Sequence, residues 1–202
     1  MIVDSAPVAG DLDRRPGFIM VMLIEFRCML QTLFLLIRGR IGLPKKQLGR
    51  RVSFLDGSTS RIYRETSLDR EASSDMVVLV VRFRLRLLGT SRVGHALFRL
   101  ESLVNTVLFA AHRGFRTKLW LTDLTTGFYR GIYEWAGQAD AIRYAEILRV
   151  VLRPWVERRS FGYRIIQAEN RESFLRGEVQ PEEALSADSA WWLPAAAAPD
   201  DW

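Results

Sequence analysis

The sequence has very few of the residues that most often build metal centres and nucleophilic active sites. It contains one cysteine, Cys28, which excludes an internal disulfide and a cysteine-based zinc site. Its two histidines, His95 and His112, are too few for a multi-histidine metal centre. It also lacks a glycine-rich phosphate loop, a Gly-x-Ser-x-Gly nucleophile elbow and metal-ligand spacing. We therefore expect no metal and no cofactor, and the sequence indicates no particular reaction.

Charge is plentiful but unevenly distributed. The 202 residues are 49% hydrophobic, enough for a folded core, and carry a net charge of +6 with a pI near 10.0. Residues 169–202 contain eight acids and two bases, a net charge of −6, so residues 1–168 carry +12. A basic body followed by an acidic tail indicates anionic partners for the body, which the tail can screen.

An apolar run of twenty residues, 18–37 (FIMVMLIEFRCMLQTLFLLI), follows a polar N-terminus at 1–17 that we expect to be flexible. Its length matches a bilayer. Glu25 and Arg27 each oppose insertion by about 2.5–3.5 kcal/mol, however, whereas each Leu, Ile, Phe or Val favours it by only about 0.3–0.6 kcal/mol. A lone membrane-spanning helix is therefore marginal. Met20 and Met22, inside the run, are alternative translation starts.

The segment after this run is basic and contains no acid up to residue 51. Such a cluster beside an apolar helix is typical of a cytoplasmic membrane surface, where each basic charge contributes about 1 kcal/mol against anionic lipid. For residues 18–50 we predict a helix with a basic segment at the inner face of the cytoplasmic membrane. Packing of the helix on the domain or on a second subunit is the alternative. The predicted membrane contacts are Phe18, Leu23, Phe34, Arg38, Arg40, Lys45 and Lys46.

From residue 51 the apolar residues alternate, which indicates strands. Residues 51–65 (RVSFLDGSTSRIYRE) alternate on both sides of Asp56-Gly57-Ser58, and Asp-Gly supplies the positive φ angles of a tight turn. We predict a β-hairpin there, followed by a polar linker to residue 75. Residues 76–89 (MVVLVVRFRLRLLG) form the clearest strand, with one apolar face and one face that becomes basic toward its end.

The remaining pattern predicts a helix over 93–112, a strand after Gly114, a turn at 123–127, a strand over 128–135, a helix over 138–152 and a strand over 160–167. The order β-α-β-β-α-β over 76–168 is the ferredoxin-like α+β arrangement. Both helices then cover one face of the sheet, and the other face is apolar enough to need a cover. We predict a homodimer through that face.

The stretch GFRTKLWLTDLTTGFYRGIYEW followed by AGQADAIRYAEIL (114–148) resembles the dimeric α+β barrel superfamily. More narrowly, it resembles proteins related to antibiotic-biosynthesis monooxygenases, including the YdhR-like group. The resemblance covers residues 76–168. It implies two ferredoxin-like units whose sheets close into a barrel, often with a small hydrophobic ligand between sheet and helices. Some members oxidise aromatic substrates without metal or flavin, others bind haem, and many have no known activity.

The resemblance also implies an Asn and a Trp near the pocket, and Asn105 and Trp120 are the comparable pair. A solvated asparagine and a packing tryptophan are the structural alternatives. His95 is a further candidate for a general base or haem ligand, although no carboxylate lies at orienting spacing. The candidate ligand-binding residues are Arg82, Arg84, Arg130 and Tyr133. The three arginines form an anion site if their strands pair, and a solvated sheet end otherwise.

Two functions remain from this pattern. The first is a membrane-associated, dimeric module that binds a small hydrophobic ligand or a partner. The second is a cofactor-independent, monooxygenase-like enzyme for a hydrophobic or aromatic substrate. Nucleic-acid binding is not favoured, because the glycine-aromatic strand signature of RNA-binding split βαβ sheets is missing.

The last segment, 169–202, is rich in Ala, Pro and acids, and such composition usually cannot order itself. We predict a largely disordered tail. Its Trp191-Trp192 pair is expected to dock weakly, either on the basic sheet end or on the apolar N-terminal helix.

Overall fold

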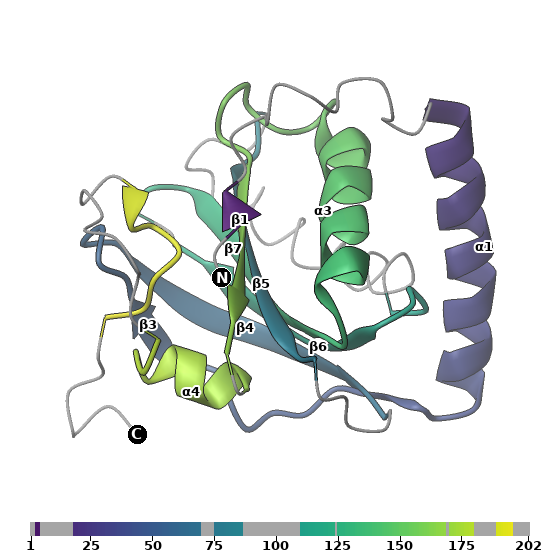
Figure 1. Cartoon of the computed structure of the whole chain (residues 1–202), viewed down its shortest axis with the longest axis horizontal. Coiled ribbons are helices and arrows are strands. Elements are labelled where there is room, and N and C mark those ends of the chain that lie inside the picture. The colour runs from purple at the N-terminus through teal and green to yellow at the C-terminus, as the bar shows by residue number, and fades with distance from the viewer. Residues whose placement is uncertain are drawn as a thin grey trace.

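The computed structural model describes residues 3–4, 18–69, 75–86, 110–123, 125–168, 170–179 and 189–195. Within these ranges, one antiparallel sheet forms the centre and helices lie on both of its faces (Figure 1). The helices are α1 (Phe18–Ile37), α3 (Gln138–Leu152) and α4 (Arg171–Leu175). The strands are β1 (Val3–Asp4), β2 (Ile41–Gly42), β3 (Arg51–Ser53), β4 (Thr59–Leu68), β5 (Val77–Arg84), β6 (Phe115–Thr122), β7 (Phe128–Trp135) and β8 (Gly162–Gln167).

The sheet order is β1-β8-β5-β7-β6-β4-β2, with β3 paired to β4. Its four inner strands, β8-β5-β7-β6, have the neighbours that a βαββαβ unit requires, and all pairs are antiparallel. Helix α3 has the predicted bounds. Most of the helix predicted over 93–112 lies outside the described residues. The architecture is a mixed α+β fold with an antiparallel sheet, consistent with the ferredoxin-like arrangement.

The predicted hairpin is confirmed and lengthens the sheet at the β6 edge. The Phe54 amide donates to the Ser58 carbonyl at 2.9 Å, and Gly57 adopts a φ of +78° that favours glycine. The linker prediction is wrong for residues 66–68, which continue β4. Thr66 and Leu68 are buried, so pairing with β6 and β2 is more favourable there than a solvated loop.

The first residues also differ from expectation. Val3 and Asp4 form the short strand β1 on the outer side of β8, within the segment expected to be flexible. An edge strand presents unpaired backbone groups that a passing segment can satisfy.

Strand alternation divides the core into two layers. In β5, Leu79 and Val81 face α3, whereas Val78 and Val80 face the opposite side. The α3 layer is strongly aromatic, and the opposite layer is mainly aliphatic on the sheet side. Both layers contain side chains that are almost completely buried.

The chain's own C-terminal segments cover the opposite layer. We call residues 170–179 and 189–195 the C-terminal cover. Phe174 and Trp192 are fully buried in it, and Leu175 and Trp191 nearly so. The Leu55 amide donates to Leu193 O at 3.0 Å, which fixes the cover to the β3–β4 turn.

This cover corrects the expected tail. Residues 170–179 and 189–195 are packed, because their aromatic and aliphatic side chains gain more from the apolar sheet face than the acids lose. The expected docking of Trp191-Trp192 does occur, on the sheet face opposite α3 and beside the basic residue Arg82, rather than on α1. The cover also fills the face through which we predicted a homodimer. Homodimer formation itself stays a prediction.

Buried polar contacts tie the cover to the sheet. Arg171 donates to Glu65 Oε1 at 2.6 Å and to Thr117 Oγ1 at 2.9 Å, and its amide donates to Glu134 Oε1 at 2.9 Å. Asn170 caps α4 through a reciprocal pair of hydrogen bonds with Ser173.

Candidate functional site

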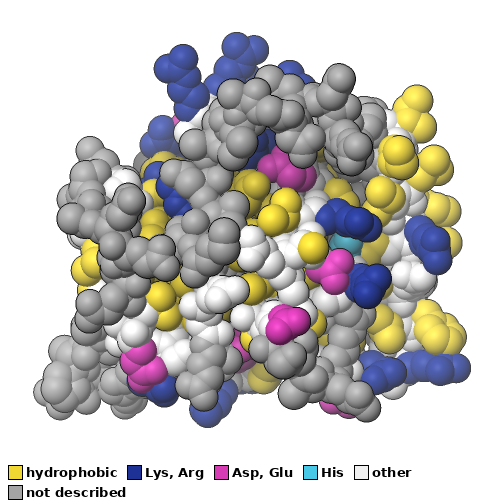
Figure 2. Space-filling view, viewed as in Figure 1, with side chains coloured by type: hydrophobic (Ala, Val, Ile, Leu, Met, Phe, Trp, Pro, Cys, Tyr) yellow, Lys and Arg dark blue, Asp and Glu magenta, His cyan; other side chains and the backbone are white. Residues whose placement is uncertain are grey.

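Helix α1 presents an apolar surface on the side away from the domain. Opposite it, Cys28 and Thr32 are buried, and the Thr32 hydroxyl accepts a hydrogen bond from the Ala111 amide at 3.0 Å. The outward side chains recur at helical spacing and are 52–77% exposed. Figure 2 shows hydrophobic side chains gathered along the edge of the molecule where α1 lies. We call this surface the apolar stripe: Ile19, Leu23, Phe26, Leu30, Phe34 and Ile37.

The predicted basic residues continue from the end of this stripe. Arg38, Arg40, Lys45 and Lys46 are all exposed. The Arg38 guanidinium lies 4.2 Å from the centroid of the Phe34 ring, so a stripe residue and a basic residue are in direct contact. Arg40 donates to the Asp69 carbonyl at 3.1 Å. Of the predicted membrane contacts, Phe18 begins α1, but its side chain is outside the description.

In the described part of the chain, no helix combines the length and the apolar character needed to cross a membrane.

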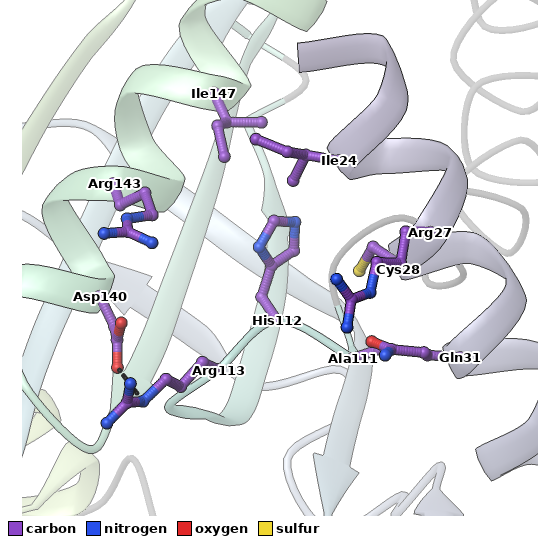
Figure 3. A pocket seen from close by; sticks show the side chains of 10 residues that line it. All are labelled: Ile24, Arg27, Cys28, Gln31, Ala111, His112, Arg113, Asp140, Arg143 and Ile147. Atoms are coloured by element: carbon purple, nitrogen blue, oxygen red, sulfur yellow. Dashed lines mark ion pairs between the residues drawn. The ribbon is translucent and has the colours of Figure 1, made fainter. Parts of the chain in front are cut away.

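A cleft of about 230 Å³ lies between α1 and α3 (Figure 3). Residues 111–113 form its floor, and its walls come from the facing sides and flanks of the two helices. Asp140 Oδ2 lies 3.8 Å from Arg113 Nε. The His112 ring packs edge-on against Tyr144, with centroids 5.4 Å apart. The lining residues are Ile24, Arg27, Cys28, Gln31, Ala111, His112, Arg113, Asp140, Arg143 and Ile147.

A buried lysine lies among aromatic rings on the α3 side of the sheet. Lys118 Nζ is 3.0 Å from the Trp120 ring centroid and 4.6 Å from that of Tyr133. Burial lowers the pKa of Lys118 well below its ordinary value, and the positive charge of Arg64 lowers it further. Trp120 Nε1 donates to Thr66 Oγ1 at 3.2 Å, which fixes the indole. A lysine shifted toward its neutral form is a base and a nucleophile.

Two predicted residues, Trp120 and Tyr133, therefore meet in this cluster. The Tyr133 hydroxyl lies 3.4 Å from that of Tyr144, and burial raises the pKa of Tyr133 above its ordinary value. Burial, assisted by the charge of Glu146, also raises the pKa of Tyr163 to about 12, and its hydroxyl donates to Glu146 Oε1 at 2.9 Å. Both tyrosines are therefore neutral at physiological pH.

The predicted arginine cluster forms in part, on the covered face. Arg82 and Arg130 are register partners on β5 and β7, and both reach Asp56 Oδ2, at 3.5 and 3.4 Å. Arg130 also donates to Ser58 and Ser60 at 2.6 Å. Burial lowers the pKa of Arg130 to about 10, although the Asp56 charge acts in the opposite direction.

Through these contacts, Arg82 and Arg130 support the turn of the β3–β4 hairpin. Arg82 additionally lies 4.6 Å from the Trp191 ring centroid, beneath the C-terminal cover. Arg84 pairs with a different acid, Glu157, whose Oε2 lies 2.6 Å from Arg84 Nε, although its guanidinium lies over the same Phe128 ring as that of Arg82. Their use as a shared anion site stays a prediction.

His95 and Asn105 lie outside the described residues. The cleft and Lys118 were not predicted as sites. A polar residue at an inward position of β6 was the available signal for Lys118. The cleft has no such local signal, since its arginines come from α1, a loop and α3. Among the described residues, no group of three or more His, Cys, Asp or Glu side chains could hold a metal ion.

No protein-family model matches the chain, and no curated protein matches it. Similar solved structures include a candidate monooxygenase from Lactobacillus acidophilus NCFM (11% identity, TM-score 0.33), an anthrone oxidase-like protein (15%, 0.37) and a monooxygenase-like protein from Listeria innocua (12%, 0.36). The matches cover 48, 55 and 70% of this chain and 46, 55 and 88% of theirs. The chain thus spans about half the length of the first two.

Two of the three names are of the monooxygenase type that the sequence resembles. At 11–15% identity and TM-scores of 0.33–0.37, they transfer neither an activity nor a site to this chain.

Proposed function

We propose that the protein is a membrane-associated α+β module for a small hydrophobic ligand, held at an anionic membrane surface by α1 and the basic segment. The observation that carries this proposal is the apolar stripe. Six large apolar side chains remain exposed on one side of a helix whose other side is already packed. Contiguous exposed apolar surface of this kind marks an interaction site.

The stripe and the basic residues together favour a membrane over water. Fully burying one Leu, Ile or Phe contributes about 1.5–3 kcal/mol. Six half-exposed residues therefore contribute on the order of 5–9 kcal/mol. Four basic side chains, at about 1 kcal/mol each near an anionic surface, add a similar but salt-dependent amount. A neutral protein partner would account for the stripe but not for the adjoining basic charges.

The helix would lie along the membrane rather than cross it. Cys28 and Thr32 attach its inner side to the domain, and Arg27 lies on one flank. An interfacial helix buries only its apolar face, about 5–10 Å deep. This orientation places the sheet and α3 on the water side, at the inner face of the cytoplasmic membrane.

Vesicle flotation tests this proposal. The full chain should float with vesicles that contain anionic lipid and much less with neutral ones. The double variant Phe26→Ser/Leu30→Ser should reduce flotation at least tenfold. Leu55→Ser is the matched control, because Leu55 is 50% exposed but lies in the β3–β4 turn. Recovery of the double variant equal to that of the control would remove the proposal. Self-association without flotation would assign the stripe to a second copy.

A second function, a monooxygenase-like enzyme for an aromatic substrate, is favoured by one observation. Lys118, Trp120 and Tyr133 bring a base-competent amine and aromatic rings together between the sheet and α3. Oxygen uptake with a panel of hydroxylated aromatics tests it. Lys118→Met should abolish uptake, and Lys45→Met should leave it unchanged. Absence of uptake by the native chain on every compound would leave the cluster as packing.

A further inference from the structure

The cleft between α1 and α3 has two chemically different ends. Figure 3 shows Ile24 and Ile147 facing each other at one end, across the two helices. Figure 3 shows Arg27 extending inward from α1 and Arg143 extending from α3 on the other side of His112, whereas the Arg113 side chain, which is 93% exposed, turns away from both toward Asp140. The cleft is therefore amphiphilic, with an apolar end and a cationic end.

The charges at the cationic end do not balance within the lining. Asp140 is the single acid among the lining residues, and its carboxylate is 3.8 Å from Arg113. Two guanidinium groups exceed what this carboxylate can neutralise. Arg27 and Arg143 are exposed arginines that line the same cleft, and an anion bound between them reduces their mutual repulsion.

We propose that this cleft binds a phosphate group carried on a short apolar portion, as in the headgroup region of an anionic phospholipid. A guanidinium offers planar, paired N–H donors that match phosphate oxygens, and charge-assisted bonds of this type are the stronger ones. The cleft, at about 230 Å³, is smaller than the roughly 300–1,000 Å³ of sites for drug-sized ligands. Its size fits a headgroup better than a whole lipid.

The position of the cleft supports a lipid source for the phosphate, and to this extent the inference rests on the proposed function. Arg27 and Gln31 lie on the flank of α1, between the apolar stripe and the buried side. When the stripe is immersed about 5–10 Å, this flank lies at the level of the lipid headgroups. Ile24 and Ile147 then meet the first carbons below the phosphate.

Calorimetric titration of the full chain with soluble probes tests the cleft without a membrane. Dihexanoyl phosphatidic acid, below its micellar concentration, should bind the native chain. Dihexanoyl phosphatidylcholine, whose headgroup has no net charge, should bind at least tenfold more weakly. Arg143→Gln should lower the affinity for the phosphatidic acid at least tenfold. Arg153→Gln, the same change on an exposed arginine at the end of α3, should lower it less than twofold.

Inorganic phosphate is the third probe and distinguishes the sources. If inorganic phosphate binds more weakly than the phosphatidic acid, the result supports a lipid as the source of the phosphate. If the two bind equally, the result supports the phosphate site but assigns it to a free phosphate. No binding of either anion, or equal losses in Arg143→Gln and Arg153→Gln, overturns the proposal. No vesicle is present in this titration, so its failure is distinct from a failure of flotation. A chain that floats but binds no soluble phosphate would support membrane binding through the apolar stripe and contradict phosphate binding in the cleft.

Discussion

Of two large apolar surfaces on this molecule, one is buried by the chain's own C-terminal segments and the other is exposed to solvent. The face of the sheet opposite α3 is apolar along β5, β6 and β7, and the C-terminal cover buries it with Phe174, Trp191 and Trp192. The outer side of α1 is also apolar, yet its six stripe residues stay 52–77% exposed. The same chain that wraps a distant segment over one surface leaves the other open.

The two surfaces also differ in the charged residues that lie beside them. At the covered face, Arg82 and Arg130 share Asp56, and Arg171 is bound to Glu65, so each of these arginines has a carboxylate partner within the chain. At the stripe, Arg38 contacts Phe34 and the following basic segment contains no acid to residue 51. Internal pairing is what a structural interface needs. An exposed basic border, here Arg38, Arg40, Lys45 and Lys46, is what an anionic partner needs.

The largest expected effect comes from opening the covered face. Trp192→Ala removes a fully buried indole and should lower the free energy of unfolding by about 3–5 kcal/mol. Trp155→Ala, at a tryptophan that is 59% exposed, should change it by less than about 0.5 kcal/mol. Urea denaturation measures both. Equal, small losses would mean that the cover does not contribute to folding.

The tie between cover and sheet should give the next largest effect. Glu65→Ala removes the buried carboxylate that lies 2.6 Å from the Arg171 guanidinium, leaves it the half-exposed Glu172 at 3.6 Å, and should destabilise by about 2–4 kcal/mol. Replacing both members of the pair, Glu65→Met/Arg171→Met, should recover part of that loss, since no buried charge then remains. A double variant less stable than the single one would show that the pair stabilises beyond mutual neutralisation.

The sequence predicted these elements unevenly. Local patterns sufficed for the Asp56-Gly57 hairpin, for the alternation of β5 and for α3, which ends before Pro154. The cover depends on contacts between distant residues, such as Arg171 with Glu65, 106 positions apart. The acids and alanines of this segment indicated disorder. Composition does not reveal which distant surface Trp192 can reach, so the packing of the cover was not predicted. Lys118 similarly lies on a strand position that alternation directs inward, but alternation does not tell whether a lysine there is buried or turns its amine to solvent.

A smaller, pH-dependent effect is expected at Lys118. Its pKa in the folded chain lies below its ordinary value near 10.5, so between these two values the unfolded chain binds more protons. The native chain should therefore gain stability relative to Lys118→Met as pH rises from neutral toward 10. Urea midpoints of both proteins at several pH values measure this gain. Parallel curves over that range would show that the amine titrates normally.

The most direct test of the central claim follows one position of the stripe during membrane contact. Cys28→Ser/Leu30→Cys carries an environment-sensitive fluorophore on the stripe, and Cys28→Ser/Leu55→Cys carries it in the β3–β4 turn. With anionic vesicles, the emission at position 30 should shift to shorter wavelength and that at position 55 should not. High salt should weaken the shift, because it screens the basic segment. Unchanged emission at position 30 at saturating anionic lipid would contradict the assignment of the stripe to a membrane surface.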